Sequence, residues 1–421
     1  MTEILIVAAS VFGYAMVSQR SSMSPVTAPM VFTTIGLIFG IGGLGWFDLD
    51  IEGESVAILV EATLVLVLFT DAVDVDLRVL RKESGIPTRL LGVSLPLTIV
   101  AGTVAAVLLF DGLNLAEAAL LAAVLAPTDA ALGQAVVSDK RLPVRVRQNL
   151  SVESGLNDGI VLPVVTVLIA IAAAEAGATT SAGTGEFVLR QIGFGLLCGA
   201  VIGAVGAWLL RFQASRNRIE GVFRQLATVA VAAAAFSAAS LLDGNGFIAA
   251  FVAGLAFGYF ASEECSDVAD FTEDEGKLLT AITFITFGAV LIGPLLEELT
   301  WQIAVYAVLS LTVVRIIPTM FSLIRSGTSF ETRLFAGWFG PRGLASILFA
   351  LIVLEEHRTP KTEQIFTVAM WTVLLSVFAH GITASPWTGH LARRLREGPG
   401  DKPELAPMEG MATRKISGGD H

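Results

Sequence analysis

Long apolar runs separated by short polar breaks fill most of the chain. The runs at residues 56–69, 160–174 and 226–242 are examples. A helix that spans a bilayer needs about 20 predominantly apolar residues. The pattern predicts thirteen membrane spans, at residues 3–18, 27–46, 55–75, 87–110, 114–137, 148–175, 187–211, 223–242, 246–261, 277–296, 301–324, 330–354 and 364–391. The predicted fold class is therefore an all-α polytopic membrane protein.

The composition excludes several other classes of protein. Of the 421 residues, 54% are hydrophobic and 15% are charged, whereas a soluble domain carries about 25% charged residues. A water-soluble globular enzyme, a disordered protein and a nucleic-acid binder are excluded on this ground. We predict a membrane domain at residues 1–396 and a disordered cytoplasmic tail at residues 397–421, where glycine, proline and charged residues replace the apolar runs.

The distribution of lysine and arginine predicts the orientation in the membrane. If the N-terminus lies outside, most of the 27 basic residues fall in cytoplasmic loops or in the C-terminal segment. This bias is the one that the positive-inside rule describes. The loop at 262–276 is acidic although it is cytoplasmic in this scheme, but the rule gives acidic residues little weight. We therefore expect a multi-pass protein of the cell inner membrane or plasma membrane, with the N-terminus outside and the C-terminus in the cytoplasm.

Polar groups far from the ends of a span indicate function, because a charge at the bilayer centre costs about 2.5–3.5 kcal/mol. In the fifth span, Pro127 precedes Thr128 and Asp129. Proline removes a backbone donor and disturbs the preceding turn. Transporters use such broken helices to expose backbone groups to ions. This motif alone is equally compatible with a kinked packing helix.

The sixth span carries two polar rows on one face of the helix. Ser154 and Asp158 are four residues apart, as are Glu153 and Asn157. Carboxylate and hydroxyl oxygens are the ligands that hard cations prefer, so Asp158 is the strongest candidate for a cation ligand. A polar contact between helices is the alternative, but two acids, an amide and a hydroxyl on one face make it the weaker interpretation.

Two arginines lie inside the predicted spans. Arg315 is about ten residues from its cytoplasmic loop, too far to reach the interface by extending its side chain. An arginine stays protonated in a protein, so Arg315 needs an anionic partner, and Glu153 is the first choice. Arg342, in the segment Gly340-Pro-Arg-Gly of the twelfth span, is the alternative partner of Glu153.

The positions of the two interrupted spans suggest an inverted repeat. Spans five and twelve are each second from the end of a six-span block, and a single span separates the blocks, so the blocks run in opposite senses. Two discontinuous helices that cross at the middle of the membrane are typical of this arrangement. We expect Asp129 to face the paired positive N-ends of the half-helices, and Arg342 to face the paired negative C-ends.

The motifs Pro127-Thr-Asp, Glu153-Ser-Gly-Leu-Asn-Asp-Gly and Gly340-Pro-Arg-Gly-Leu-Ala-Ser resemble those of the monovalent cation/proton antiporter superfamily. The Asn157-Asp158 pair is similar to that of its first branch, which holds the prokaryotic NhaP-type and the eukaryotic sodium/proton exchangers. The resemblance implies a homodimer that works by an elevator-like alternation. It also implies a moving core at about 87–175 and 301–391, dimer-domain spans at about 3–75 and 223–296, and a linking span at about 187–211.

The resemblance also implies roles for single residues. The ion-binding aspartate of the family falls on Asp158, its neighbouring asparagine on Asn157 and its serine ligand on Ser154. The threonine and aspartate of the unwound segment fall on Thr128 and Asp129. The transported Na+ is thus expected at Asp158, Ser154 and Thr128, and a structural ion pair at Glu153 and Arg315.

The predicted function is exchange of Na+, or Li+, for H+ without a cofactor, by a protein whose partners are these ions, the lipid bilayer and a second copy of itself. Asn157 has no titrating group, which predicts an electroneutral exchange of one cation for one proton. A K+/H+ exchanger or an electrogenic exchanger of the same fold is the alternative. A cation channel is a remote one, because no repeated filter segment is present.

Other polar residues carry weaker predictions. The four histidines, at 357, 380, 390 and 421, show no metal-ligand spacing, so an intramembrane enzyme is not expected. His380 is interpreted as a polar packing contact in preference to a proton relay. Asp71 and Asp74, near the end of the third span, are interpreted as a solvated helix end in preference to an entrance funnel. Two cysteines, Cys198 and Cys265, provide no disulfide framework.

Overall fold

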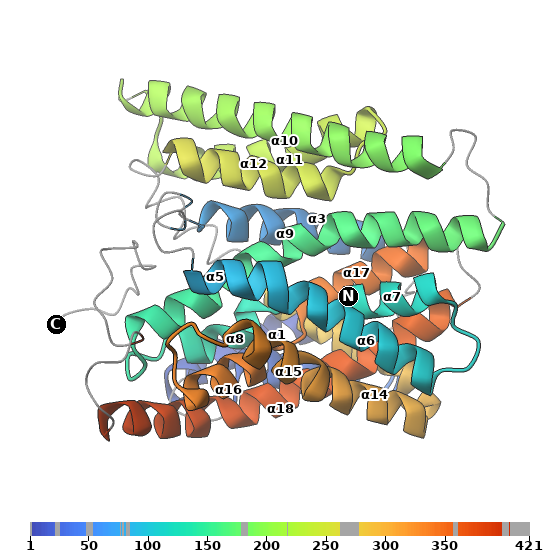
Figure 1. The fold of residues 1–421 in the computed structure, drawn as a ribbon. Coiled ribbons are helices and arrows are strands. Elements are labelled where there is room, and N and C mark those ends of the chain that lie inside the picture. The colour runs from blue at the N-terminus through green and yellow to red at the C-terminus, as the bar shows by residue number, and fades with distance from the viewer. Residues whose placement is uncertain are drawn as a thin grey trace.

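The structure is a computed structural model that describes residues 2–21, 26–47, 54–75, 77, 80, 85–177, 184–216, 218–261, 278–356, 361–397 and 404. The described part of the chain forms a bundle of helices without a β-strand (Figure 1). This confirms the predicted all-α fold class. The acidic loop at 262–276 and nearly all of the predicted tail lie outside the described residues.

The helices follow the predicted spans in order. The N-terminal half contains α1 (Thr2–Ser21), α2 (Ala28–Phe39), α3 (Glu54–Val73), α5 (Gly85–Arg89), η1 (Leu90–Ser94), α6 (Leu95–Leu109), α7 (Leu115–Val124), α8 (Ala130–Val137) and α9 (Val144–Glu175). The remainder contains α10 (Thr184–Ala214), α11 (Gly221–Leu241), α12 (Gly246–Ala261), a helix at Leu278–Ile292 that ends in η2 (Phe287–Ile292), η3 (Pro294–Glu298), α14 (Trp301–Leu311), α15 (Val313–Ser322), α16 (Phe330–Trp338), α17 (Leu344–Glu356) and α18 (Thr362–Glu397).

Length and composition identify the chain as a multi-pass membrane protein. In the part of the chain that the structure describes, six helical stretches are long and apolar enough to cross a bilayer, namely Gly85–Leu109, Val144–Glu175, Gly185–Ala214, Val222–Leu241, Trp301–Ser322 and Thr362–Glu397. Shorter apolar helices lie between them. Two predicted spans are each replaced by a pair of helices, α7 with α8 and α16 with α17. A span built from two half-helices leaves backbone groups free in its middle.

The second span, predicted at 27–46, is shorter in the structure, because its helix ends well before residue 46. The helix α2 ends at Phe39, and the chain then turns back, so that the N–H groups of Trp46 and Phe47 both donate to the carbonyl of Phe39. Gly45 has φ = +66° in this turn, a conformation that glycine adopts at little cost. The side chain of Phe47 is buried, so apolar residues beyond the helix end pack as a loop.

The eleventh predicted span, 301–324, is not one continuous helix. It is interrupted at Thr312, which has φ = −110° and ψ = −93° and separates α14 from α15. The fourth span contains a π-helical turn, η1. Such turns are frequent at functional sites, and Ser94 in η1 lies 2.9 Å from Thr319 of α15 through their hydroxyl oxygens. Periodicity of apolar residues does not detect either irregularity.

The two breaks lie in the interior of the bundle. In Figure 1, α10, α11 and α12 form a layer over α3 and α9, while α6, α8, α14, α15, α16 and α18 lie on the other side. Helix α7 packs against α6 and α9, and α17 packs against α18. The first break covers residues 125–129 and the second covers residues 339–343. The polar residues of the sixth span, on α9, therefore face two interrupted helices.

Candidate functional site

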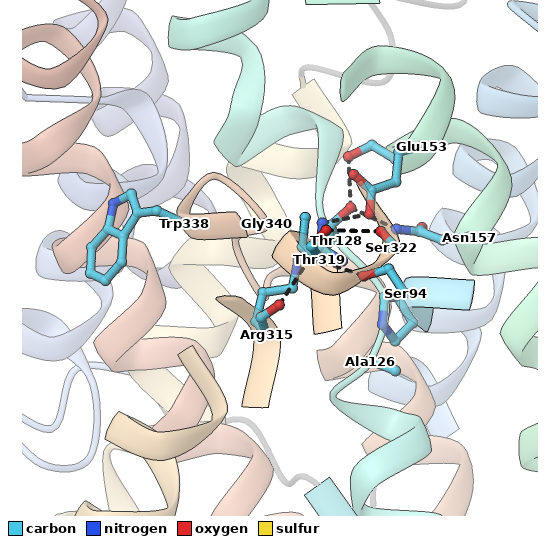
Figure 2. Close-up of polar contacts among 12 residues, drawn as sticks. Ser94, Ala126, Thr128, Glu153, Asn157, Arg315, Thr319, Ser322, Trp338 and Gly340 are labelled. Atoms are coloured by element: carbon cyan, nitrogen blue, oxygen red, sulfur yellow. Dashed lines mark hydrogen bonds and ion pairs between the residues drawn. The ribbon is translucent and has the colours of Figure 1, made fainter. Parts of the chain in front are cut away.

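The two breaks contact each other through the backbone. The N–H of Asp129 donates to the carbonyl of Pro341 at 2.8 Å. Figure 2 shows Thr128 of the first segment close to Gly340 of the second. Backbone groups that a continuous helix would satisfy internally are thus partly paired across the crossing.

Asp129 binds the N-terminal ends of two half-helices. Its Oδ1 accepts the N–H of Leu132 at 2.8 Å and thereby caps α8. Its Oδ2 accepts the N–H of Leu344, the first residue of α17. The carboxyl group is buried, with 5% of the residue exposed, and it lies where both helix dipoles are positive. In the structure, Asp129 thus lies between the two helix N-ends, where the sequence analysis expected it.

Arg342 lies at the opposite ends of the half-helices. Its Nη1 donates to the carbonyls of Ala126 and Pro127 at 3.2 Å each, and to that of Gly340 at 3.1 Å. These carbonyls follow the C-terminal ends of α7 and α16, where the helix dipole is negative. The guanidinium therefore compensates the carbonyl ends, as expected from the sequence, and is not the hydrogen-bonded partner of Glu153.

Glu153 on α9 pairs with Arg315 on α15. The distance from Arg315 Nη2 to Glu153 Oε1 is 2.5 Å, and both side chains are buried. The carbonyl of Arg315 accepts the hydroxyl of Thr319, whose oxygen also lies beside that of Ser94 (Figure 2). Glu153 thus pairs with Arg315, as the sequence favoured. The pair connects the sixth span to the irregular eleventh span.

Thr128, Ser154 and Asn157 form a hydrogen-bonded group between the first break and α9. The amide Nδ2 of Asn157 donates to the hydroxyl oxygen of Thr128 at 2.6 Å, and that oxygen lies 3.0 Å from the hydroxyl of Ser154. Asn157 therefore holds the unwound segment against α9. The structure brings these three predicted residues together at one point.

Asp158 directly follows Asn157 on α9, and one of its two carboxylate oxygens lacks a hydrogen-bond partner among the described residues. The residue is 4% exposed, and its Oδ1 has no hydrogen-bond partner among the described residues. A buried charge without a partner is costly, and a bound proton or a bound cation would each neutralise it. The chemistry of the donor set, namely carboxylate and hydroxyl oxygens, suits a hard monovalent cation.

Asp158 lines a cavity of about 150 Å³. Asp129 and Asp158 line it together with residues from the beginning of α2, the end of α3 and the beginning of the helix at Leu278–Ile292. Asp71 of α3 also lines the cavity and is half-buried, whereas Asp74 is exposed. The interpretation as a solvated helix end therefore fits Asp74 but not Asp71. The entrance funnel, which the sequence analysis ranked second because the apolar run ends just before Asp71, is the interpretation that fits this residue.

A second cavity, of about 200 Å³, lies between α3, α9, α10, α11 and α12. Glu61, Thr166 and Asn245 are among its lining residues, but Asp158, Asp129 and Ser154 are not. Asp158 and Asp129 are thus reached from the first cavity and not from the second.

Of the histidines, His380 is buried in α18 and contacts the carbonyl of Trp338 and the side chain of Ser376. This placement agrees with a polar packing contact. His357 and His421 lie outside the described residues. Cys198 is a buried free cysteine on α10, and Cys265 lies outside the described residues.

Comparison with known families and sequences gives a consistent result. The family model described as "Sodium/hydrogen exchanger, transmembrane" matches residues 6–389. The chain is similar to a "Na(+)/H(+) antiporter 2" of Zygosaccharomyces rouxii, with 28% identity over 84% of this chain and 48% of that protein. It thus spans about half the length of that relative.

Two prokaryotic relatives match over more of their length. A "K(+)/H(+) antiporter NhaP" of Alkalimonas amylolytica is 26% identical over 93% of this chain and 67% of that protein. A "Na(+)/H(+) antiporter ApNhaP" of Aphanothece halophytica is 27% identical over 89% of this chain and 72% of that protein.

The fold is similar to that of a solved structure. The sodium proton antiporter MjNhaP1 of Methanocaldococcus jannaschii superposes with a TM-score of 0.76 at 18% sequence identity, over 94% of this chain and 100% of that chain. At this level of identity, the similarity establishes the common fold.

Proposed function

Because the chain belongs to the sodium/hydrogen exchanger family, we propose that it exchanges Na+, or Li+, for H+ across the membrane. The observation that carries this proposal is the state of Asp158. Its carboxyl group is buried, lines a cavity and has an oxygen without a hydrogen-bond partner among the described residues. Asp158 lies on α9 one turn after Ser154, whose hydroxyl group contacts that of Thr128.

One carboxylate serves both ions in this mechanism. Asp158 holds the cation with help from the oxygens of Ser154 and Thr128, and a proton on Asp158 removes the negative charge that the cation needs. The two ions therefore compete, and the site crosses the membrane carrying one or the other. Asn157 keeps Thr128 in place, while Asp129 and Arg342 keep the half-helix ends together.

The exchange is electroneutral in this scheme, with one cation for one proton. Asn157 does not titrate, and Arg315 compensates the charge of Glu153. Two helix N-ends donate to the carboxylate of Asp129 and favour its charged form. Asp158 is then the one group that gains and loses a proton in each cycle.

The position of the cavity supports an alternating mechanism that opens the site to one side at a time. Residues near the end of α3 line the cavity at Asp158, and the sequence that follows α3 contains Arg78, Arg81 and Lys82. By the positive-inside rule we propose that this is the cytoplasmic side, with the N-terminus outside and the C-terminus inside.

Further proposals concern the assembly. We assign the core to residues 87–175 and 301–391, which include both breaks and α9. This core moves against the spans at 3–75 and 223–296, with residues 187–211 as the link. The stationary spans form the contact with a second copy in a homodimer.

A K+/H+ exchange is the second candidate, and the similarity to the relative named K(+)/H(+) antiporter NhaP supports it. Both candidates use the same site and differ only in the preferred cation. Cavity size and the number of ligands determine that preference.

Dissipation of a pH gradient by Na+, Li+ and K+ in turn, in proteoliposomes, tests the proposal. Wild-type protein should exchange, and Asp158→Asn should be folded but inactive, because an amide neither binds a proton nor attracts a cation. Asp74→Asn is the matched control, since Asp74 is exposed at the end of the same α3 that lines the cavity; it should exchange normally. Exchange at the wild-type rate in Asp158→Asn would refute the assignment, and a macroscopic cation current would indicate a channel.

A further inference from the structure

Helix α18 carries two buried polar side chains that face the break between α16 and α17. Ser376 and His380 are one helical turn apart, and they are 0% and 1% exposed, respectively. Buried polar groups in a membrane bundle are expensive unless they are hydrogen-bonded. The partners of these two residues therefore indicate what they do.

The two side chains bind opposite ends of the unwound segment. The Nε2 of His380 lies 2.9 Å from the carbonyl of Trp338, the last residue of α16. A carbonyl only accepts, so the tautomer of His380 with its hydrogen on Nε2 donates to Trp338. The hydroxyl oxygen of Ser376 accepts the N–H of Arg342 at 2.7 Å, two residues before α17 begins.

A third contact joins the two side chains. The hydroxyl oxygen of Ser376 lies 3.1 Å from Nδ1 of His380, and that nitrogen is also 3.0 Å from the carbonyl of Ser376. Whichever way the hydrogen bond between the side chains runs, both ends of the break at 339–343 are attached to the same turn of α18. We call Ser376 and His380 the clasp.

Aromatic packing fixes the histidine end of the clasp. The rings of Trp338 and His380 have centroids 5.0 Å apart, and Nε1 of Trp338 donates to the hydroxyl of Thr383, again on α18, at 2.9 Å. In Figure 2 the indole of Trp338 points away from the polar group around Thr128 and Glu153. The end of α16 is thus held from the side opposite to the predicted cation site.

The other side of the same segment is attached to the cation site. Pro341 accepts the N–H of Asp129, and Arg342 donates to the carbonyls of Ala126 and Pro127, which directly precede Thr128. Neither clasp residue lines the cavity at Asp158. The clasp therefore does not touch the cation, and its effect on the site passes through Arg342.

We propose that Ser376 and His380 are positioning residues for the cation site, which hold the second break against α18 and thereby fix Thr128 and Asp129 in the first break. The inference rests on the proposed function, because it concerns the cation that Asp158 and Thr128 bind. Loosening the clasp leaves the carboxylate of Asp158 in place but allows the oxygens beside it to move. The cation loses ligand geometry, while the proton, which needs only the carboxylate, does not.

The test compares four variants in proteoliposomes. Ser376→Ala removes the acceptor for Arg342, and His380→Phe removes the donor to Trp338 while keeping a planar ring. His380→Gln retains an N–H donor at the end of the side chain. Thr372→Val is the matched control, because Thr372 is buried on the same helix one turn earlier but bonds only to the carbonyl of Val368 in its own helix.

The measured quantities are KM and Vmax for Na+ and for Li+, and the Tm of each purified variant. Ser376→Ala and His380→Phe should each raise KM for Na+ by about tenfold, as expected for a lost buried hydrogen bond that perturbs binding. The ratio of the KM values for Li+ and Na+ should change as well, because the two ions differ in size. For His380→Gln and Thr372→Val, the KM for Na+ and the ratio of the KM values for Li+ and Na+ should both stay near those of the wild type.

Three outcomes would overturn the inference. The first is a lower Tm or Vmax in His380→Phe and Ser376→Ala with unchanged KM values and an unchanged Li+ to Na+ ratio, which marks a purely structural role. The second is a Thr372→Val variant as impaired as Ser376→Ala. The third is a His380→Gln variant as impaired as His380→Phe. If His380→Phe does not fold, Ser376→Ala decides alone. A wild-type protein without cation-dependent proton flux refutes the proposed function instead.

Discussion

Arg315 and Glu153 are 162 positions apart in the sequence, yet Nη2 of the first lies 2.5 Å from Oε1 of the second in the interior of the bundle. The pair joins α15 to α9, the helix that also carries Ser154, Asn157 and Asp158. It therefore supports the candidate site without belonging to the cation ligands. Two opposite charges compensate each other here, and the removal of one leaves the other buried and unpaired.

Single neutral replacements of this pair should destabilise the protein. Glu153→Gln or Arg315→Leu should each lower the free energy of unfolding by about 3–5 kcal/mol, and the double replacement should recover part of the loss. Thermal unfolding in detergent measures this. The exposed pair of Arg190 and Glu186 on α10 provides the control, and Glu186→Gln should change stability by less than about 1 kcal/mol. A stable Glu153→Gln variant with altered cation affinity would make Glu153 a ligand instead.

Gly343→Ala should disrupt the contact between the two breaks. A Cβ at position 343 would overlap Oδ2 of Asp129, the atom that accepts from Leu344. We expect a loss of about 1–3 kcal/mol in stability and a strong loss of exchange, measured by Tm and by proton flux. Gly133→Ala on α8 is the control, because a Cβ there meets no atom within 4 Å. Normal exchange by Gly343→Ala would contradict the proposed role of Asp129.

Ser154→Ala should weaken cation binding without removing it. The variant loses one hydroxyl oxygen beside Thr128 but keeps the carboxylate of Asp158. KM for Na+ should rise by about tenfold, which corresponds to about 1.4 kcal/mol, with Vmax little changed. Ser151→Ala, one turn earlier on α9 and exposed, serves as the control. An unchanged KM in Ser154→Ala would remove Ser154 from the set of ligands.

The exchange rate should not depend on the membrane potential. Na+ and H+ neutralise Asp158 equally, so the core crosses the field with the same charge in both directions. A moved charge would experience about 2.3 kcal/mol per 100 mV. Proteoliposomes clamped with valinomycin and K+ at zero and at inside-negative potential, under a fixed Na+ gradient, measure this dependence. Equal rates, and a stall point where the Na+ and H+ ratios match, are expected. A stall point that shifts with voltage would mean that Glu153 or Asp129 titrates.

Local patterns in the sequence contain the information for the helices and for both breaks. Each membrane span must satisfy its own backbone hydrogen bonds, so apolar length alone locates most of the helices, and Pro127 and the segment 340–343 locate the interruptions. The same local rule misplaces the end of α2 and does not detect the interruption at Thr312. Phe47 is apolar but lies in a loop, and Thr312 has no local feature that ends a helix.

The polar residues inside the spans could also be identified from the sequence, because a charge in the bilayer has to be compensated. Their small number restricts the possible pairs. The sequence favoured Arg315 as the partner of Glu153 and left Arg342 as the alternative, and the structure contains the pair with Arg315. Asp71 shows the limit of this reasoning. Its position at the end of an apolar run suits a solvated helix end, and only the packing of α3 beside α2 and the helix at Leu278–Ile292 places it in the cavity with Asp158.

The sequence by itself determined the fold class, the order of the spans and the set of polar residues that the membrane interior has to accommodate. Only the tertiary structure decided which backbone groups these residues bind. Asp129 reaches the N-end of α17, Arg342 reaches the carbonyls of the first break, and Ser376 and His380 bind the two ends of the second break. These contacts join residues that are far apart in the chain or lie on different helices. They depend on how the helices cross, which is set by the packing of the whole bundle and not by any local pattern.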